Sequence, residues 1–211
     1  MTEHGTLNTV IHEAFRRDFA RFDKALGAFP AGSRDRSAQL ATAWDNTAYQ
    51  LHHHHSDEET IFWPALRELG ADESLVGDLH GEHEQLLTAL SSAEGTMATF
   101  RADPSAENAA SSRTSIAELA RVFEDHIVHE VRDLEPFAIA KLGTPPMKAA
   151  AVAVRKAHKG NSGTFFAWLH DGAGDAERRF LRQDIPPPVM FMIVKLGGRK
   201  YTKTIAPVWA S

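Results

Sequence analysis

The stretch of sequence that decides the fold lies in mid-chain, at Leu51–Pro64, and reads LHHHHSDEETIFWP. Four consecutive histidines, His52–His55, are followed after one residue by the acidic run Asp57–Glu59. A helical period of apolar residues continues on both sides of this polar cluster; its members are Leu51, Phe62, Ala65, Leu66 and Leu69. The cluster is therefore predicted to lie on the inner face of a helix.

The spacing within the cluster indicates metal binding. His54 and Glu58 are four residues apart, as are His55 and Glu59. Each imidazole is thus expected one helical turn from a carboxylate, where both can reach one metal ion. A solvated acidic and histidine-rich surface is the alternative, but it would interrupt the apolar period, which continues. Periodicity alone does not choose between the two pairs.

Composition limits the possible chemistry. The 211 residues include no cysteine, which excludes disulfides and thiolate metal sites and leaves histidine and carboxylate ligands for iron, manganese or zinc. Residues 144–211 carry 11 Lys+Arg and 4 Asp+Glu, a net charge of +7, which leaves 12 and 24, a net charge of −12, for residues 1–143. The acidic part argues against nucleic-acid binding. We find no signal-peptide pattern and no apolar run long enough for a membrane span, so we expect a cytoplasmic protein.

The apolar pattern predicts an all-α fold. Four amphipathic helices are expected at about residues 6–26, 37–69, 72–100 and 106–142. Joined by short loops, they make an up-down-up-down four-helix bundle, a fold that commonly holds metal sites in its core. We place this bundle at residues 1–143 and a C-terminal helical extension, not an independent domain, at 144–211.

The extension contains an apolar run, Val189–Val194, next to basic residues. We expect the bundle to cover this run, because apolar burial should provide most of the stability of a tail of this size. A membrane-surface anchor is the competing interpretation. It is less favoured because prolines up to Pro188 and the Gly197–Gly198 pair bracket a segment of barely two turns.

Polar residues on the inner faces of the four helices form a candidate ligand set. They are His12, His54, Glu58, His83, His126 and Glu130. Burying six such groups without partners would cost several kcal/mol, and a metal centre removes that cost. Six ligands with two carboxylates suit two divalent ions, each with two histidines and both sharing two bridging glutamates. His80 is expected at the edge of the apolar arc of its helix, and His129 points away from the arc of its own.

The order His, His-x-x-x-Glu, His, His-x-x-x-Glu resembles the hemerythrin-like, HHE cation-binding proteins. The segments that carry the resemblance are His12–Asp18, His54–Pro64, Glu82-His83 and His126–Pro136. Pro64, six residues after Glu58, selects the His54/Glu58 pair and leaves His55, Glu59, His80 and His129 as candidate supporting residues around the ligands. The resemblance covers about residues 7–143, and the extension carries no ligand motif that matches.

The resemblance implies a non-haem di-iron centre of Fe²⁺/Fe³⁺ ions, oxo- or hydroxo-bridged, that meets O₂, hydrogen peroxide or nitric oxide. Oxygen-carrying hemerythrins use five histidines and two carboxylates, whereas the matched set here has four and two. This more open coordination shell favours peroxide decomposition in oxidative or nitrosative stress, a catalase-like activity, over reversible transport. The alternative is a non-enzymatic O₂ or iron sensor or storage protein with an unidentified protein partner. A structural zinc site is disfavoured because such sites are closed and four-coordinate.

Overall fold

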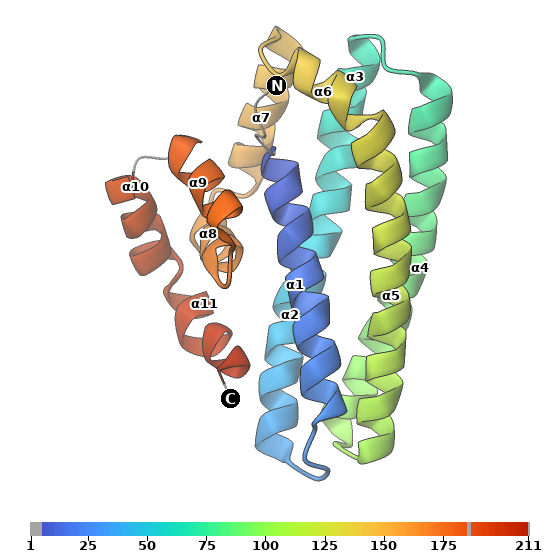
Figure 1. The fold of residues 1–211 in the computed structure, drawn as a ribbon, viewed down its shortest axis with the longest axis vertical. Helices are drawn as coiled ribbons and strands as arrows, with labels where there is room; N and C mark the ends of the chain where they lie inside the picture. The colour runs from blue at the N-terminus through green and yellow to red at the C-terminus, as the bar shows by residue number, and fades with distance from the viewer. Residues whose placement is uncertain (1–5, 185–186, 211) are drawn as a thin grey trace.

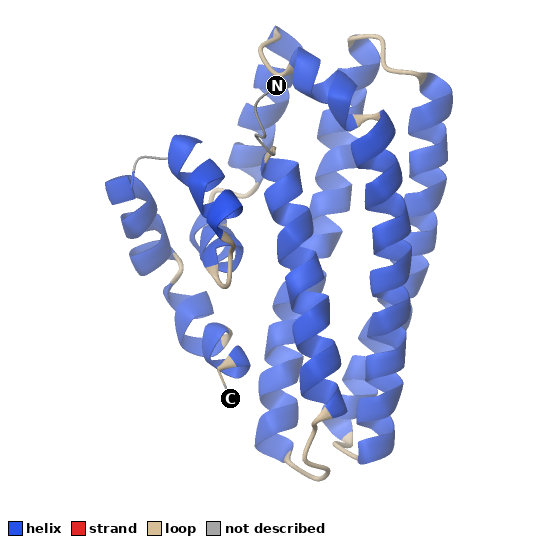
Figure 2. Ribbon diagram, viewed as in Figure 1, coloured by secondary structure: helices blue, strands red, loops and turns tan. Residues whose placement is uncertain are grey.

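Four long helices form the body of the molecule (Figure 1). The computed structural model describes residues 6–184 and 187–210, and this part of the chain contains helices and loops but no strand (Figure 2). The long helices are α1 (Leu7–Gly27), α2 (Arg34–Asp57), α4 (Glu73–Ala102) and α5 (Ala106–Asp133). Helix α1 packs on α5, α5 on α4 and α4 on α2, so the four close into a bundle. The predicted all-α bundle is confirmed.

Local sequence signals begin and end these helices. The N-caps of the four long helices are Thr6, Ser33, Asp72 and Ser105, and each side chain accepts a backbone N–H of the first turn. Gly70, directly after the predicted end of the second helix at residue 69, has φ +90, a left-handed conformation that glycine adopts without strain.

The second helix is not regular to its end. After Asp57 it widens into one π-helical turn, η1 (Glu58–Phe62), and then continues as α3 (Trp63–Glu68). The Trp63 N–H donates to the Glu58 carbonyl five residues back. Pro64 has no N–H to give to the Thr60 carbonyl, which favours the wider turn at this point. The fourth helix is interrupted similarly at Leu134, before α6 (Glu135–Lys141) and its Pro136.

The C-terminal extension is a series of short helices beside α1 and α2 (Figure 1). They are α7 (Pro145–Ala157), α8 (Ser162–His170), α9 (Asp175–Asp184), α10 (Pro187–Met192), η2 (Ile193–Gly197), α11 (Arg199–Thr204) and η3 (Ala206–Trp209). Trp168 of α8 is fully buried, and its ring centroid lies 4.9 Å from that of Phe15 on α1. The extension and the bundle therefore share one apolar core. Whether residues 144–211 can fold alone stays a prediction.

A buried carboxylate of the bundle accepts a hydrogen bond from the extension. Asp18 of α1 accepts hydrogen bonds from the Trp168 indole N–H at 2.7 Å and from the Thr47 hydroxyl at 3.0 Å. Its other oxygen faces the guanidinium groups of Arg21 at 3.4 Å and Arg17 at 3.8 Å. We call Asp18 and these four partners the Asp18 cluster.

We expected the bundle to cover the apolar run of the extension, but half of the run is exposed. Met190 is buried, but Val189, Phe191 and Met192 are exposed, because α10 packs with one side only. Residues 185 and 186, at the expected break before α10, lie outside the described residues. Among the described helices, none combines the length and the apolar character that crossing a membrane requires.

Candidate metal centre

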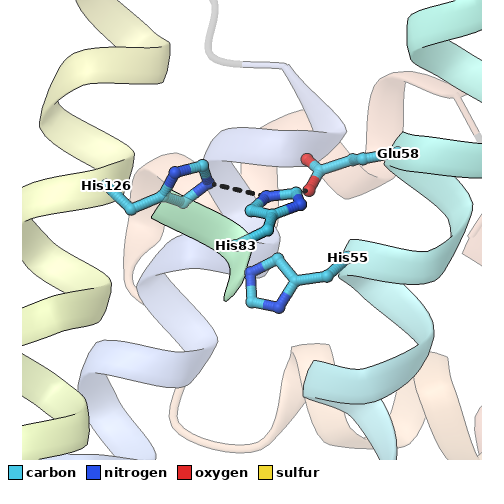
Figure 3. Close-up of side chains that lie close together, drawn as sticks. All are labelled: His55, Glu58, His83 and His126. Carbon is cyan, nitrogen blue, oxygen red and sulfur yellow. Dashed lines mark hydrogen bonds and ion pairs between the residues drawn. The ribbon is translucent and has the colours of Figure 1, made fainter. Parts of the chain in front are cut away.

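Seven buried side chains meet in the core of the bundle. Their positions are His12 on α1, His54 and His55 on α2, Glu58 on η1, His83 on α4, and His126 and Glu130 on α5. Figure 3 shows four of them converging: His55 and Glu58 come from one chain segment, His126 comes from the helix opposite, and His83 lies between them. All four bundle helices thus contribute to one cluster.

The cluster divides into two groups that share Glu58. The possible ligand atoms of His12, His54 and Glu58, the first group, lie within 4.8 Å of one another, and so do those of His55, Glu58, His83 and His126, the second group. One Glu58 oxygen is 3.5 Å from His54 Nε2, and the other is 3.5 Å from His83 Nε2. A carboxylate with one oxygen toward each group is placed to bridge two cations.

Glu130 lies against the first group. Its Oε2 is 3.5 Å from His12 Nε2. The Asn8 side-chain amide donates to both Glu130 oxygens, at 3.3 and 3.2 Å, and holds the carboxylate in the core. The sequence reasoning missed Asn8. Its position four residues before His12, one turn away on the same helix face, was the available signal.

The imidazole rings are oriented as metal ligands. His83 Nδ1 donates to Glu59 at 2.9 Å and His126 Nδ1 donates to Glu82 at 3.0 Å, which leaves both Nε2 atoms as lone-pair donors. Those two Nε2 atoms nevertheless face each other at 3.1 Å (Figure 3). A separation of about 3 Å is that of neighbouring ligands on one ion with bonds of about 2.1 Å. A shared cation would turn this repulsive contact into a binding geometry.

Buried atoms without a hydrogen-bond partner also indicate a metal site. Neither ring nitrogen of His55 has a hydrogen-bond partner among the described residues, and neither does Glu58 Oε2. Buried polar atoms are normally paired, and each such exception needs an explanation. The donor set of imidazoles and carboxylates is one that iron, manganese or zinc accepts. The residues present therefore fit a metal centre.

Burial sets the protonation of the cluster. Desolvation lowers the pKa of His12 to about 3 and of His83 to about 2, and it also lowers the pKa of His54, His55 and His126. The histidines are therefore neutral and ready to donate lone pairs. Desolvation raises the pKa of Glu130 to about 7 and that of Glu58 well above its usual value, and the nearby Glu130 carboxyl raises Glu58 further. The carboxyls hold protons that a cation would displace.

Carboxylates link the cluster to residues nearer the surface. Glu59 also accepts from His80 Nδ1 at 3.0 Å, and Glu82 also accepts from His129 Nδ1 at 2.7 Å. His80 is exposed and His129 half-buried, and neither belongs to the two ligand groups. Trp63 stacks on His83 at 4.4 Å between ring centroids, with 22° between the ring planes.

The sequence-predicted residues map onto this arrangement in a simple way. All six predicted ligands lie in the cluster, and Glu59, His80 and His129 lie outside the two groups in supporting positions; their roles in metal binding stay predictions. His55 differs, because we placed it among the supporting residues and its ring lies 4.4 Å from that of His83, inside the second group. An angular position at the side of the helical arc was not enough to show that its ring reaches the centre.

Residues 9–138 match the family model described as hemerythrin HHE cation binding domain. The match covers the four long helices and all seven residues of the cluster. Searches of curated proteins and of solved structures found no match.

Proposed function

The chain belongs to the hemerythrin HHE cation-binding family, and from this premise we propose that its buried cluster binds two iron ions and reacts with a small oxidant. Hydrogen peroxide is the favoured substrate, and O₂ and nitric oxide belong to the same chemical class of small redox-active ligands. The observation that carries the proposal is the position of Glu58, whose two oxygens face different histidine groups.

Seven residues would hold the iron. His12 and His54 would serve one ion, His55, His83 and His126 the other, and Glu58 and Glu130 would bridge the pair. Bound iron supplies one-electron exchange with a ligand at an open coordination position. Two histidines approach Glu58 in the first group and three in the second, so the side of His12 and His54 would leave more room for a small ligand, and we place the ligand there.

The surrounding residues prepare the site without binding the metal. Glu59 and Glu82 hold His83 and His126 in the tautomer that presents Nε2 inward. Phe15 and Phe123 pack against the first group, with Phe123 5.8 Å from the ring of His12, and keep bulk water away. A small neutral molecule such as peroxide suits this apolar surrounding better than a charged substrate.

Peroxide decomposition gives a direct test of this function. Two molecules of hydrogen peroxide yield two of water and one of O₂, so evolved O₂ measures the reaction. We expect protein reconstituted anaerobically with Fe²⁺ to hold about two ions per chain and to evolve O₂ from peroxide. Metal-free protein and iron-loaded Glu58→Ala protein are the controls. Iron-loaded protein that leaves peroxide untouched would contradict the proposal.

Reversible O₂ binding by a carrier or sensor is the second candidate, and His55 favours it. With His55 the cluster contains five histidines and two carboxylates, a more filled shell than the six predicted ligands gave. Optical spectra during repeated cycles of air and inert gas separate the candidates. A spectrum that returns unchanged after each cycle, without peroxide turnover, would favour the sensor.

The role of His55 can be tested separately. We expect His55→Ala to lower bound iron strongly. His52→Ala should not, since the exposed His52 contacts Glu94 on the bundle surface. Equal iron content in the two variants would return His55 to a supporting role.

A further inference from the structure

The segment α10–η2 has an apolar face that no described residue of the chain covers. Met190 packs inward, and Ile193 and Val194 are half-buried. On the opposite side, the exposed fractions are 41% for Val189, 62% for Phe191, 55% for Met192 and 66% for Leu196. We call these four residues the outer face. In Figure 1, α10 lies at the edge of the molecule that is farthest from the bundle.

Helical geometry shows that the outer face is one continuous surface. At about 100° per residue in α10, Val189 and Met192 follow one stripe and Phe191 lies beside it, while the wider turn of η2, with a smaller angle per residue, returns Leu196 to the side of Met192. Met190 and Val194 fall on the other side, where the segment packs. A helix that is apolar on both sides normally has both sides buried. The outer face therefore has the character of a binding surface rather than of a solvated one.

Positive charge adjoins the outer face at Lys195 and follows it in the chain. Residues 187–210 contain Lys195, Arg199, Lys200 and Lys203 and no aspartate or glutamate. All four cations are exposed, and within the described chain no carboxylate lies at ion-pair distance from them. The Lys195 ammonium is 5.8 Å from the centre of the Phe191 ring, so charge and apolar surface adjoin directly.

We propose that the outer face docks on a membrane surface rich in anionic lipid. Exposed apolar side chains beside lysines on a short helix match the requirements of the lipid interface, where apolar groups enter below the headgroups and cations contact phosphates. The segment lies in the plane of the interface and does not cross it. From the sequence, a packed tail and a membrane anchor were competing interpretations. In the structure one side of α10 packs on the chain and the other is free to contact a membrane, so the two are compatible. This proposal does not depend on the metal.

Vesicle flotation with the full chain tests the proposal. The probes are phosphatidylcholine vesicles with and without about one third of phosphatidylglycerol. We expect binding to the anionic vesicles and its progressive loss with added salt. Phe191→Ser combined with Leu196→Ser should weaken binding at least about tenfold. Lys195→Glu combined with Lys200→Glu should abolish the preference for anionic vesicles.

Matched controls come from the bundle. Leu87→Ser removes a similarly exposed apolar side chain from α4, and Lys24→Glu reverses an exposed charge on α1; both should bind vesicles as the unaltered chain does. Far-UV circular dichroism and melting temperature establish that each variant is folded, and Phe191→Ser alone is the milder variant if the double change unfolds the segment.

Two results would overturn the proposal. One is a folded chain that binds neither kind of vesicle, or that binds both equally. The other is retention of anionic-vesicle binding in the folded outer-face variants. Sedimentation velocity identifies the alternative occupant: a dimer that Phe191→Ser converts to monomer, without vesicle binding, would assign the outer face to a second copy of this chain.

Discussion

Two clusters of buried polar side chains lie in the same bundle, and their polar atoms are satisfied to different degrees. In the Asp18 cluster the protein itself satisfies the carboxylate, through Trp168, Thr47 and two arginines. The metal cluster is left incomplete: His55 and one Glu58 oxygen have no hydrogen-bond partner in the described chain. Both clusters draw on α1 and α2. Burial alone therefore does not mark a metal site, whereas several imidazole and carboxylate atoms that converge, some of them without a protein partner, indicate one.

Asp18→Ala should produce the largest loss of stability. It leaves the buried Trp168 N–H without its acceptor and removes the negative charge that the half-buried Arg17 and Arg21 face, a type of change that costs about 3–5 kcal/mol. Iron content per folded chain should not change, because Asp18 is not a ligand. Denaturant unfolding of the iron-loaded protein measures the first effect and metal analysis the second. Asp23→Ala is the control, since Asp23 is exposed on the same helix. Iron lost in proportion to stability would show that the two clusters are coupled.

Glu58→Ala should have the opposite pattern: it should lose bound iron without lowering the stability of the metal-free protein. Bound iron should be largely lost, along with the stabilisation that iron gives, about 4 kcal/mol when free iron is a thousand times its dissociation constant. The metal-free variant should be no less stable than metal-free wild type, because the substitution removes an unpartnered oxygen. Glu130→Ala should also lose metal, whereas His80→Ala and His129→Ala should keep it. Equal iron loss in all four variants would refute the ligand set.

Glu59→Ala and Glu82→Ala should have intermediate effects. Each removes the carboxylate that orients a ligand histidine, a change that typically weakens metal binding about 10–100-fold. Competition with a chelator of known affinity measures this. Glu84→Ala, an exposed carboxylate on α4, should leave the affinity unchanged. An equal loss in that control would indicate a general charge effect rather than orientation of the ligands.

The pH dependence of metal binding should show the smallest effect. The pKa of Glu130 is raised to about 7, so at pH 6 this group is protonated and must release its proton when a cation binds. The Glu130 contribution should therefore make affinity rise with pH until this group is ionised, above about pH 8, and Glu58, whose pKa burial also raises, acts in the same direction. His12 contributes nothing in this range because burial lowers its pKa to about 3. Calorimetry in buffers of different ionisation enthalpy counts the protons. Release that is as large at pH 9 as at pH 6 would contradict the assignment to Glu130.

The helical period predicted much of this structure. The four long helices and the inward direction of His83 and Glu130 follow from apolar spacing, because each residue advances by a nearly constant angle. The π-helical turn and the contacts between distant segments did not follow from it. The π-helical turn at Glu58 changes that angle locally, and its cause, the missing N–H of Pro64, acts through the backbone rather than through side-chain pattern.

Contacts between segments far apart in the chain could not be predicted from the sequence either. Asp18 follows Arg17 in a polar stretch, and only the fold shows that it meets Trp168, 150 residues later. The outer face was also beyond prediction, because the run Val189–Val194 is apolar throughout and its spacing does not indicate which side packs.

The stacking of Trp63 on His83 gives the centre an optical reporter. A redox-active ion on His83 would lie within a few atoms of the indole and quench its fluorescence by electron or energy transfer. Emission should therefore fall as iron is added and recover when a chelator removes it. Trp63→Phe should keep the iron and lose this response, although three other tryptophans remain. A metal-dependent signal that survives the substitution would instead point to Trp168, which reaches His54 through Phe15.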